Sequence, residues 1–396
     1  ALPGTTFARF RVSSTGNLAA TGPAADGEVE DYAVNIGTAV NNVFVLEQVS
    51  DIPESEVVQH PAFNANGSMV VFSSTADLTG HNPRGRSQLF VKDMMADTLT
   101  QVTDCRGDAS GAFYTAAAKR PAINGDASKV AFISYLANDA DPFYHEALTL
   151  YDMKSETSNL LDQKIWAQDP MMSADGDRIL YWRWLDPQAP ATEYHVYDTT
   201  NSPAPTTLLA SPTPQAAPVI SADGTTAAIV ANGNYTGDNP TGVMQLFHYD
   251  VDTGTLTQLT DFTEYVYLSS PSLSADGSRL SFTSNHDFTG ENPTNSYEAF
   301  LLDVDTATVS QLTSHPEGSI YRGMLSADGT RFVYAVYEDS TTHLYLTETA
   351  SASPHLLATL DDYITPQLNA DGTRIMFTTT LDLICLLYTS PSPRDS

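Results

Sequence analysis

The chain is poor in cysteine and in basic residues. It has only two Cys among 396 residues, too few for a disulfide framework. Its 18 Lys and Arg stand against 48 Asp and Glu, which gives a formal net charge of −30. A phosphate backbone would be repelled by this charge, so we exclude nucleic acid as a partner. The sequence contains no apolar run long enough to span a bilayer, and we expect a soluble chain.

The sequence also lacks the short motifs that mark common catalytic sites. It contains no G-x-S-x-G elbow, no H-E-x-x-H pair, no P-loop and no G-x-G-x-x-G run. Its nine His are scattered singly along the chain. No catalytic residue is therefore assigned, and a binding role is favoured over an enzymatic one.

What the chain does have is a repeat. Seven hairpin anchors recur at intervals of roughly 40 to 60 residues, close to the length of known propeller blades. They are PAFNANG (61–67), PAINGDA (121–127), PMMSADG (170–176), PVISADG (218–224), PSLSADG (271–277), GMLSADG (323–329) and PQLNADG (366–372). In the second anchor Ala127 replaces the final Gly, so we expect a different turn there.

Residues 271–313 show the complete unit. A hairpin around Asp276-Gly277 leads to a polar loop, an apolar strand at 299–304, a D-x-x-T turn and a closing strand that ends in Q-L-T. One four-stranded sheet of this length cannot bury both faces and must stack on copies of itself. We therefore predict an all-β fold, a β-propeller of seven blades of four antiparallel strands over residues 45–384.

The repeat P-x-h-S-A-D-G, followed by D-x-x-T and Q-L-T, resembles the TolB-type propeller repeat. Propellers of this kind serve as protein-docking modules, as ligand binders and as gating domains of prolyl-oligopeptidase-like peptidases, so the resemblance implies a fold more firmly than a function.

The first 37 residues form a separate region. The run from Asp26 to Tyr32, preceded by a strand at 7–11, resembles the C-terminal end of the GEVED domain of bacterial extracellular proteins. The chain begins without Met and reads as a fragment, joined by a linker at 38–44 to the propeller. The resemblance implies an extracellular, cell-surface or periplasmic location.

Four carboxylates in this region could bind a hard cation such as Ca²⁺ through oxygen ligands. They are Asp26, Glu28, Glu30 and Asp31. The alternative is a solvated acidic turn, because their spacing differs from that of an EF-hand loop.

The ends of the propeller also carry signals. Residues 47–51, EQVSD, copy the closing strands of other repeats, and we expect this N-terminal segment to complete the last blade. Residues 385–396 lack repeat features and are interpreted as a non-native tail that includes Cys385.

The loops that enter the inner strands are rich in aromatic and charged residues, and we predict that these converge around the mouth of the central channel. The predicted ligand-binding residues are Tyr114, Arg120, Trp166, Asp169, Tyr265, Tyr267, Tyr321, Arg322 and Tyr363, with His60 beside them. Aromatic rings with a few polar groups suit a protein, peptide or glycan ligand. The alternative is that these side chains plug the channel or pack between blades.

A second loop, T-G-x-N-P, recurs at 79–83, 236–240 and 289–293, and its turn-forming residues favour a structural role. We thus predict a non-catalytic, monomeric binding module. The alternative is an enzyme, either a lactonase-like propeller hydrolase with an axial metal or the gating propeller of a peptidase.

Overall fold

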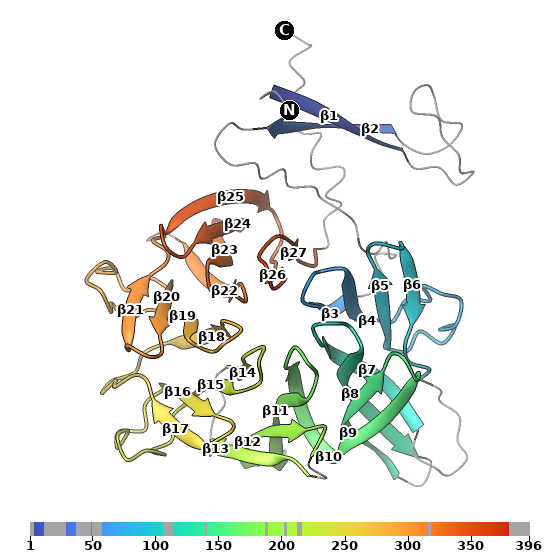
Figure 1. The fold of residues 1–396 in the computed structure, drawn as a ribbon, viewed down its shortest axis with the longest axis horizontal. Coiled ribbons are helices and arrows are strands. Elements are labelled where there is room, and N and C mark those ends of the chain that lie inside the picture. The colour runs from blue at the N-terminus through green and yellow to red at the C-terminus, as the bar shows by residue number, and fades with distance from the viewer. Residues whose placement is uncertain are drawn as a thin grey trace. The chain divides into compact units, whose positions relative to one another are not determined.

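The computed structural model describes residues 4–11, 29–36, 49, 58–105, 114–138, 141–186, 189–201, 204–211, 216–315 and 318–379. Every regular element in these ranges is a β-strand (Figure 1). Within the same ranges there is no helix long and apolar enough to cross a membrane. The chain divides into two compact units, one of residues 1–49 with 381–396 and one of residues 50–380.

The first unit contains an antiparallel strand pair. Strand β1 (Gly4–Arg11) pairs with β2 (Val29–Ile36), with Phe7 opposite Ala33. This pairing fits the two alternating strands expected there, while a GEVED-type domain stays a prediction.

The second unit is a β-propeller whose blades are antiparallel meanders. Four blades are separate four-stranded sheets in which each strand pairs with the next along the chain. They comprise β3 (Val58–Phe63), β4 (Met69–Ser74), β5 (Gln88–Asp93) and β6 (Thr98–Gln101); β14 (Val219–Ile220), β15 (Thr226–Ala231), β16 (Gln245–Asp250) and β17 (Thr255–Gln258); β18 (Leu268–Leu273), β19 (Arg279–Ser284), β20 (Glu298–Asp303) and β21 (Thr308–Gln311); and β22 (Ser319–Leu325), β23 (Arg331–Glu338), β24 (Thr341–Glu348) and β25 (Ser353–Leu360).

The second and third blades share one long strand. Their seven-stranded sheet comprises β7 (Tyr114–Ile123), β8 (Lys129–Asn138), β9 (Asp141–Asp152), β10 (Thr157–Met172), β11 (Arg178–Asp186), β12 (Ala189–Asp198) and β13 (Thr206–Ser211). The first part of β10 pairs with β9 and its last part pairs with β11. One strand is therefore both the outer strand of blade 2 and the inner strand of blade 3.

The seventh repeat forms only a two-stranded sheet, β26 (Gln367–Leu368) with β27 (Ile375–Met376). The predicted count of seven four-stranded blades is therefore wrong: the described residues form six blades and this hairpin. The reason lies in the sequence after Thr379, which lacks the D-x-x-T turn and the Q-L-T strand that complete other repeats. The expected contribution of residues 47–51 to the last blade lies outside the described residues, apart from Val49.

The hairpin turns of all seven repeats nevertheless join in a closed ring around the axis (Figure 1). Each turn donates a backbone hydrogen bond to the turn of the next repeat, and the seventh donates to the first. The N-to-O distances are 3.1 Å for Ala65 to Gly125, 2.8 Å for Gly125 to Ala174, 2.7 Å for Ala174 to Ala222, 3.0 Å for Asp223 to Ala275, 2.6 Å for Ala275 to Ala327, 2.8 Å for Ala327 to Ala370 and 2.9 Å for Ala370 to Ala65.

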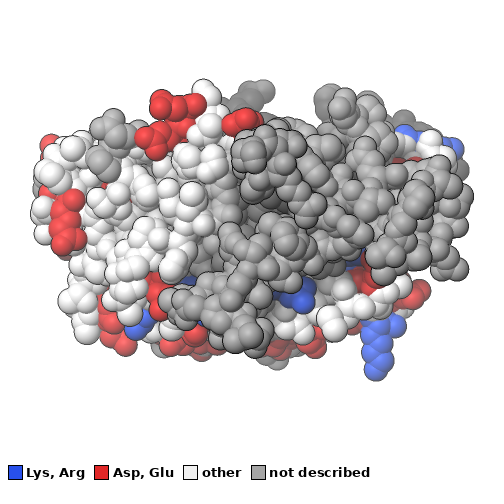
Figure 2. All heavy atoms as spheres, turned by 90° about the horizontal axis from the view of Figure 1, so that it is seen from above, with Lys and Arg blue, Asp and Glu red and all other residues white. Residues whose placement is uncertain are grey.

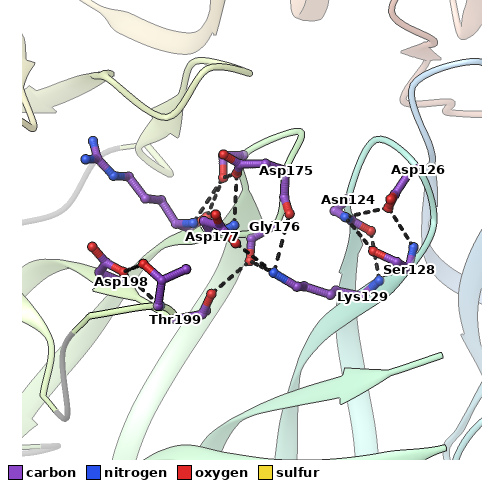
Figure 3. A network of polar contacts seen from close by, with 12 residues as sticks. Asn124, Asp126, Ser128, Lys129, Asp175, Gly176, Asp177, Asp198 and Thr199 are labelled. Carbon is purple, nitrogen blue, oxygen red and sulfur yellow. Dashed lines mark hydrogen bonds and ion pairs between the residues drawn. The ribbon is translucent and has the colours of Figure 1, made fainter. Parts of the chain in front are cut away.

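Basic side chains strengthen five of these junctions. The cation at the start of a repeat's second strand donates to the glycine carbonyl of the next turn. The pairs are Lys129 with Gly176 at 3.2 Å, Arg178 with Gly224 at 2.8 Å, Arg279 with Gly329 at 3.1 Å, Arg331 with Gly372 at 3.0 Å and Arg374 with Gly67 at 3.2 Å. Figure 3 shows Lys129 reaching this turn, where it also pairs with Asp177 at 2.8 Å.

The turn at Ala127 departs from our expectation. Ala127 has φ of 61°, and its N–H donates to the Asn124 carbonyl at 3.1 Å, as Gly67 donates to Asn64 at 3.0 Å. The expectation of a different turn is therefore wrong. Ala127 is buried in the apolar cluster between blades 1 and 2, so packing of its methyl group accompanies the left-handed backbone.

The core lies between blades rather than in one central mass. Separate apolar clusters join blades 1 and 2, blades 2 and 3, blades 4 and 5, and blades 5 and 6. Many acidic side chains lie on the surface: in the edge-on view of Figure 2 they are seen at the upper left and along the lower border, where Lys and Arg are also present. Burial of apolar side chains between neighbouring blades therefore stabilises the propeller.

Candidate functional site

The two faces of the propeller carry different connections. Because every blade is an antiparallel meander, the Asp-Gly and D-x-x-T turns lie on one face, which we call the turn face. The loops between second and third strands, and those that enter the next inner strand, lie on the other face, which we call the loop face. Exposed Asp residues at six of the hairpin turns make the turn face acidic: Asp126, Asp175, Asp223, Asp276, Asp328 and Asp371.

One position recurs at the start of every anchor, immediately before its proline or before Gly323. Its occupants are His60, Arg120, Asp169, Ala217, Ser270, Arg322 and Thr365. Inner strands line the axis of a propeller, so this position forms a ring around the channel. Four of the seven residues can carry a charge, and they are the four that we predicted from the sequence.

The backbone at this position is unusual in four repeats. The φ angles are 51° at His60, 54° at Arg120, 41° at Asp169 and 50° at Ser270. In each case the strand pairing shifts register at the following proline, which lacks the N–H that a regular ladder needs. The bulge is thus a property of the repeat, and the side chain that it presents differs from blade to blade.

The charged members of the ring influence one another. Arg120 and Asp169 form an ion pair between blades 2 and 3. The pKa of His60 lies below its ordinary value because the surrounding protein displaces water and because Arg120, Lys119 and Arg322 are positive; Asp169 opposes this effect. Arg120 and Asp169 come from neighbouring repeats and are brought together by the structure, while the convergence of the other predicted residues stays a prediction.

A row of three polar side chains lies beside this ring on blade 2. The Lys119 ammonium is 5.2 Å from the centre of the Tyr135 ring, and Tyr135 lies opposite Glu146 in the strand register. Tyr135 and Glu146 are cross-strand neighbours, and the carboxyl oxygen Oε2 of Glu146 is buried without a hydrogen-bond partner among the described residues. Glu146 is only 8% exposed.

Both acidic groups of this row have raised pKa values. Burial raises the pKa of Glu146, against the effect of the Tyr135 hydrogen bond and of Arg120 and Lys119. Burial and the neighbouring Glu146 raise the pKa of Tyr135 to about 12. The row was not predicted from the sequence, because Tyr135 and Glu146 lie in the middle of ordinary strands and meet only through the register.

Exposed tyrosines mark the same face. Tyr265 is 71% exposed and Tyr363 is 54% exposed, and both lie on loops that enter an inner strand, as predicted. Tyr297 and Tyr337 are each 38% exposed; Tyr297 lies on the connection between the second and third strands of blade 5, and Tyr337 lies near the end of β23, the second strand of blade 6. Ring contacts join Tyr267 to Tyr297 at 4.8 Å and Tyr337 to Tyr363 at 6.4 Å. All the exposed tyrosines of the described residues therefore lie on the loop face of blades 5 and 6 and of the seventh repeat.

Three predicted aromatic residues occupy strands instead of loops. Tyr114 begins β7, Trp166 lies within β10 opposite Trp184, and Tyr321 lies within β22. The expectation that they lie on loops is wrong, because β7 and β22 begin early and β10 continues unbroken from one blade to the next. The side chains of these three residues are outside the described part of the structure, so their role in binding stays a prediction.

The proposed Ca²⁺ ligands cannot be placed. Asp26 and Glu28 lie outside the described residues, as do the side chains of Glu30 and Asp31 on β2. Elsewhere in the described ranges, no group of three or more His, Cys, Asp or Glu side chains is arranged to hold a metal ion.

The T-G-x-N-P loops are structural, as expected. Asn82 is buried, and its side-chain amide donates to the carbonyls of Thr75 at 2.9 Å and Arg86 at 2.8 Å. Asn239 makes the same contacts with Asn232 at 3.2 Å and Val243 at 2.8 Å. The loop is thus fixed from within by its asparagine.

Two other features were considered as sites. A cavity of about 320 Å³ lies between blades 4 and 5, lined by Phe262, His286 and Phe288, whose rings contact one another. On blade 3, the buried His195 contacts Glu193 at 3.0 Å, and Glu193 accepts from Arg183 at 3.0 Å. The groups of the blade 3 set hydrogen-bond one another, while Glu146 Oε2 on blade 2 is buried without a partner among the described residues.

No family model matches the chain. No curated protein matches it either. Solved structures share its fold at low sequence identity. An oligogalacturonate lyase in complex with manganese has a TM-score of 0.60 and 15% identity, covering 83% of this chain and 89% of that one. The β-propeller domain of the trilobed protease from Pyrococcus furiosus, described as having an open velcro topology, has a TM-score of 0.56 and 11% identity, covering 83% and 96%.

A TolB structure from Acinetobacter baumannii is also similar, with a TM-score of 0.43 and 20% identity, covering 69% of this chain and 61% of that one. TolB propellers are thus among the structural neighbours. At these identities the comparisons support the propeller fold and leave the function open.

Proposed function

We propose that the chain is a non-catalytic binding module of a secreted or cell-surface bacterial protein, which binds a protein, peptide or glycan on the loop face of its propeller. The observation that carries this proposal is the gathering of exposed tyrosines on that face, beside the charged mouth of the channel. Tyrosine offers a large rigid contact area with one polar group, and it loses little conformational freedom when it binds.

The charge distribution supports the same face. The turn face carries exposed Asp at six repeats and would repel acidic partners, while cationic groups gather at the loop-face mouth. The named ligand of one structural neighbour, oligogalacturonate, is an acidic glycan. The five cations of the turn face are engaged with glycine carbonyls of the turn ring, so a ligand of that general kind is favoured on the loop face.

The experiment compares two variants on peptide and glycan arrays. The double variant Tyr265→Ala/Tyr297→Ala removes two exposed rings of the loop face, and Met95→Ala, at a residue 78% exposed on the turn face, is the matched control. We expect the wild-type chain and the control to bind a common set of probes, and the double variant to lose at least tenfold in affinity, or about 1.4 kcal/mol. Equal binding by all three would contradict the proposal.

The second candidate is an enzymatic role, as a propeller hydrolase or as the gate of a peptidase. The likeness to the propeller domain of a protease favours the gating version, since that domain shares the fold over 96% of its length. Mixing the chain with fluorogenic peptide and lactone substrates tests the hydrolase directly. Turnover that is lost on Glu146→Gln would favour the enzyme over the binding module.

A further inference from the structure

The cavity between blades 4 and 5 has a volume of about 320 Å³. Most of its lining comes from two connections of the loop face, the loop that leads from β17 into β18 and the segment that follows β19. None of its lining residues belongs to the ring at the channel mouth. The volume is near the lower end of ligand pockets, about 300 Å³, so the cavity has room for a side chain or a small molecule.

Three aromatic side chains line this cavity as one cluster. The rings of Phe262, His286 and Phe288 contact one another edge-on. The distances between ring centres are 5.0 Å for Phe262 to His286, 5.6 Å for Phe262 to Phe288 and 4.8 Å for His286 to Phe288. Phe288 also packs edge-on against the buried Phe282, which fixes the cluster to the core of blade 5. Because the face of an aromatic ring carries negative partial charge, such a cluster attracts a cation.

The exposed part of the lining carries negative charge as well. Its exposed residues are Asp261, Thr263 and Glu264, so two carboxylates lie on the side that faces solvent. Neither carboxylate forms an ion pair within the described ranges, and none of the lining residues that the structure describes is Lys or Arg. A cation that enters the cavity therefore meets two carboxylates without a counter-ion and then aromatic rings, whereas an acidic group would be repelled there.

Arginine is the side chain that matches both features. Its guanidinium pairs with carboxylates through charge-assisted hydrogen bonds and stacks on aromatic faces, and its stem is apolar. Tyr265 stands between Glu264 and Val266 on the lining loop and is 71% exposed, so aromatic surface continues beyond the cavity. A peptide can contact this surface on either side of an inserted arginine, which a free small cation cannot do.

We propose that the cavity between blades 4 and 5 binds an arginine side chain of a partner peptide. The guanidinium pairs with Asp261 and Glu264, and the stem packs against Phe262 and Phe288. The formal net charge of −30 adds long-range attraction for a basic partner. This inference narrows the ligand of the proposed function to a peptide that presents arginine, and it rests on the loop face being the binding face.

The test titrates a blocked pentapeptide, Gly-Ala-Arg-Ala-Gly, into the full chain by calorimetry at low salt. In one matched peptide citrulline replaces arginine, which keeps the shape of the side chain and removes its charge. We expect the arginine peptide to bind at least tenfold more tightly than the citrulline peptide, because only the guanidinium forms charge-assisted hydrogen bonds with the two carboxylates. Free argininamide, the third probe, should bind more weakly than the arginine peptide.

Variants of the chain locate the site. Asp261→Asn/Glu264→Gln should weaken binding of the arginine peptide by about tenfold or more. Glu156→Gln/Asp305→Asn is the matched control, because it removes two exposed carboxylates from turns between third and fourth strands on the turn face, and it should leave binding unchanged. Phe288→Leu keeps an apolar side chain without a ring face and should weaken the arginine peptide about threefold to tenfold. Melting temperatures show whether each variant is folded.

Several outcomes would overturn the proposal. Equal affinities for the arginine and citrulline peptides would exclude a charged occupant, and equal weakening by the two double variants would exclude this cavity. Argininamide that binds as tightly as the peptide would make the occupant a small cation. Array binding that is lost in Tyr265→Ala/Tyr297→Ala while the arginine peptide fails to bind the wild-type chain would remove the arginine site and leave the loop-face module in place.

Discussion

Arg120 and Asp169 come from neighbouring repeats, occupy the same position of each, and form an ion pair across the boundary between blades 2 and 3. Both have positive φ, 54° and 41°, at the bulge before a proline. The repeat therefore fixes the backbone position from which the side chain extends, and the residue type at that position decides the charge of the mouth. His60 lies one repeat earlier, and the charges of Arg120 and Asp169 shift its pKa in opposite directions.

Substitutions around the mouth should shift the pKa of His60 in opposite directions. Arg322→Gln removes a positive neighbour, so the pKa of His60 should rise. Asp169→Asn removes the carboxylate that favours the imidazolium, so the pKa should fall. The measurement is NMR titration of the His60 ring protons, assigned with His60→Asn. Shifts of the same sign in both variants would show that the groups do not share one mouth.

The cations of the turn ring should contribute to stability individually. Arg279 donates to the Gly329 carbonyl at 3.1 Å, and Arg279→Gln should lower the free energy of unfolding by about 1 kcal/mol. Urea denaturation measures this value. Arg84→Gln changes the net charge by the same amount at an exposed loop position and should leave the free energy of unfolding almost unchanged. An equal loss of stability in both variants would show that the hydrogen bond to the turn ring is not the cause.

The asparagine of the T-G-x-N-P loop should matter more than its exposed neighbour. Asn239→Ala leaves the carbonyls of Asn232 and Val243 without their donor, which should cost about 2 kcal/mol or more. Asp238→Ala, at the exposed variable position of the same loop, should be near neutral. Chemical denaturation of the two variants side by side decides the matter; similar losses would mean that the loop sequence acts in some other way.

The Asp-Gly turns should make the propeller sensitive to acid. Hydrogen bonds from Ser274 and Ser278 hold the pKa of Asp276 below its ordinary value of 3.8. A carboxyl whose pKa is depressed in the folded state stabilises the fold above its unfolded pKa, and this contribution is lost as the pH falls through the folded value. The melting temperature should therefore drop below about pH 4.

Asp276→Asn provides the check on this assignment. The amide does not titrate, so the variant should melt at a lower temperature near neutral pH and should show a shallower decline between pH 4 and pH 2. Parallel curves for the variant and the wild-type chain would exclude Asp276 as a source of the acid sensitivity.

The repeat pattern predicted the parts of the fold that depend on local spacing. Anchors such as 271–277 place the turns, inner strands and axis, and from them the ring of His60, Arg120, Asp169 and Arg322 follows directly. The continuity of β10 was not predictable, because pairing with two partners in succession is a tertiary property. Ala127 misled for a related reason: burial of its methyl group accompanies a φ angle that local preference disfavours.

The residues of the candidate site also differ in whether they could be predicted from local sequence. Tyr265 and Tyr363 were found because they stand on loops just before an anchor. Tyr135 and Glu146 were missed because each looks like an ordinary strand residue, and their meeting depends on the register between β8 and β9. Arg322 was found as a charge before an anchor, but the lack of a partner for it among the described residues is visible only in the structure.

The closed ring of turns is weakest at the junction between the seventh repeat and the first. Among the described residues, a backbone hydrogen bond from Ala370 to Ala65 and a side-chain hydrogen bond from Arg374 to Gly67 join the two-stranded β26–β27 to the opening turn. The junctions among the six blades, by contrast, join sheets of at least four strands. When the propeller is opened by force or heat, the opening should therefore begin at this junction. The amide hydrogens of residues 367–376 should exchange before those of the six blades.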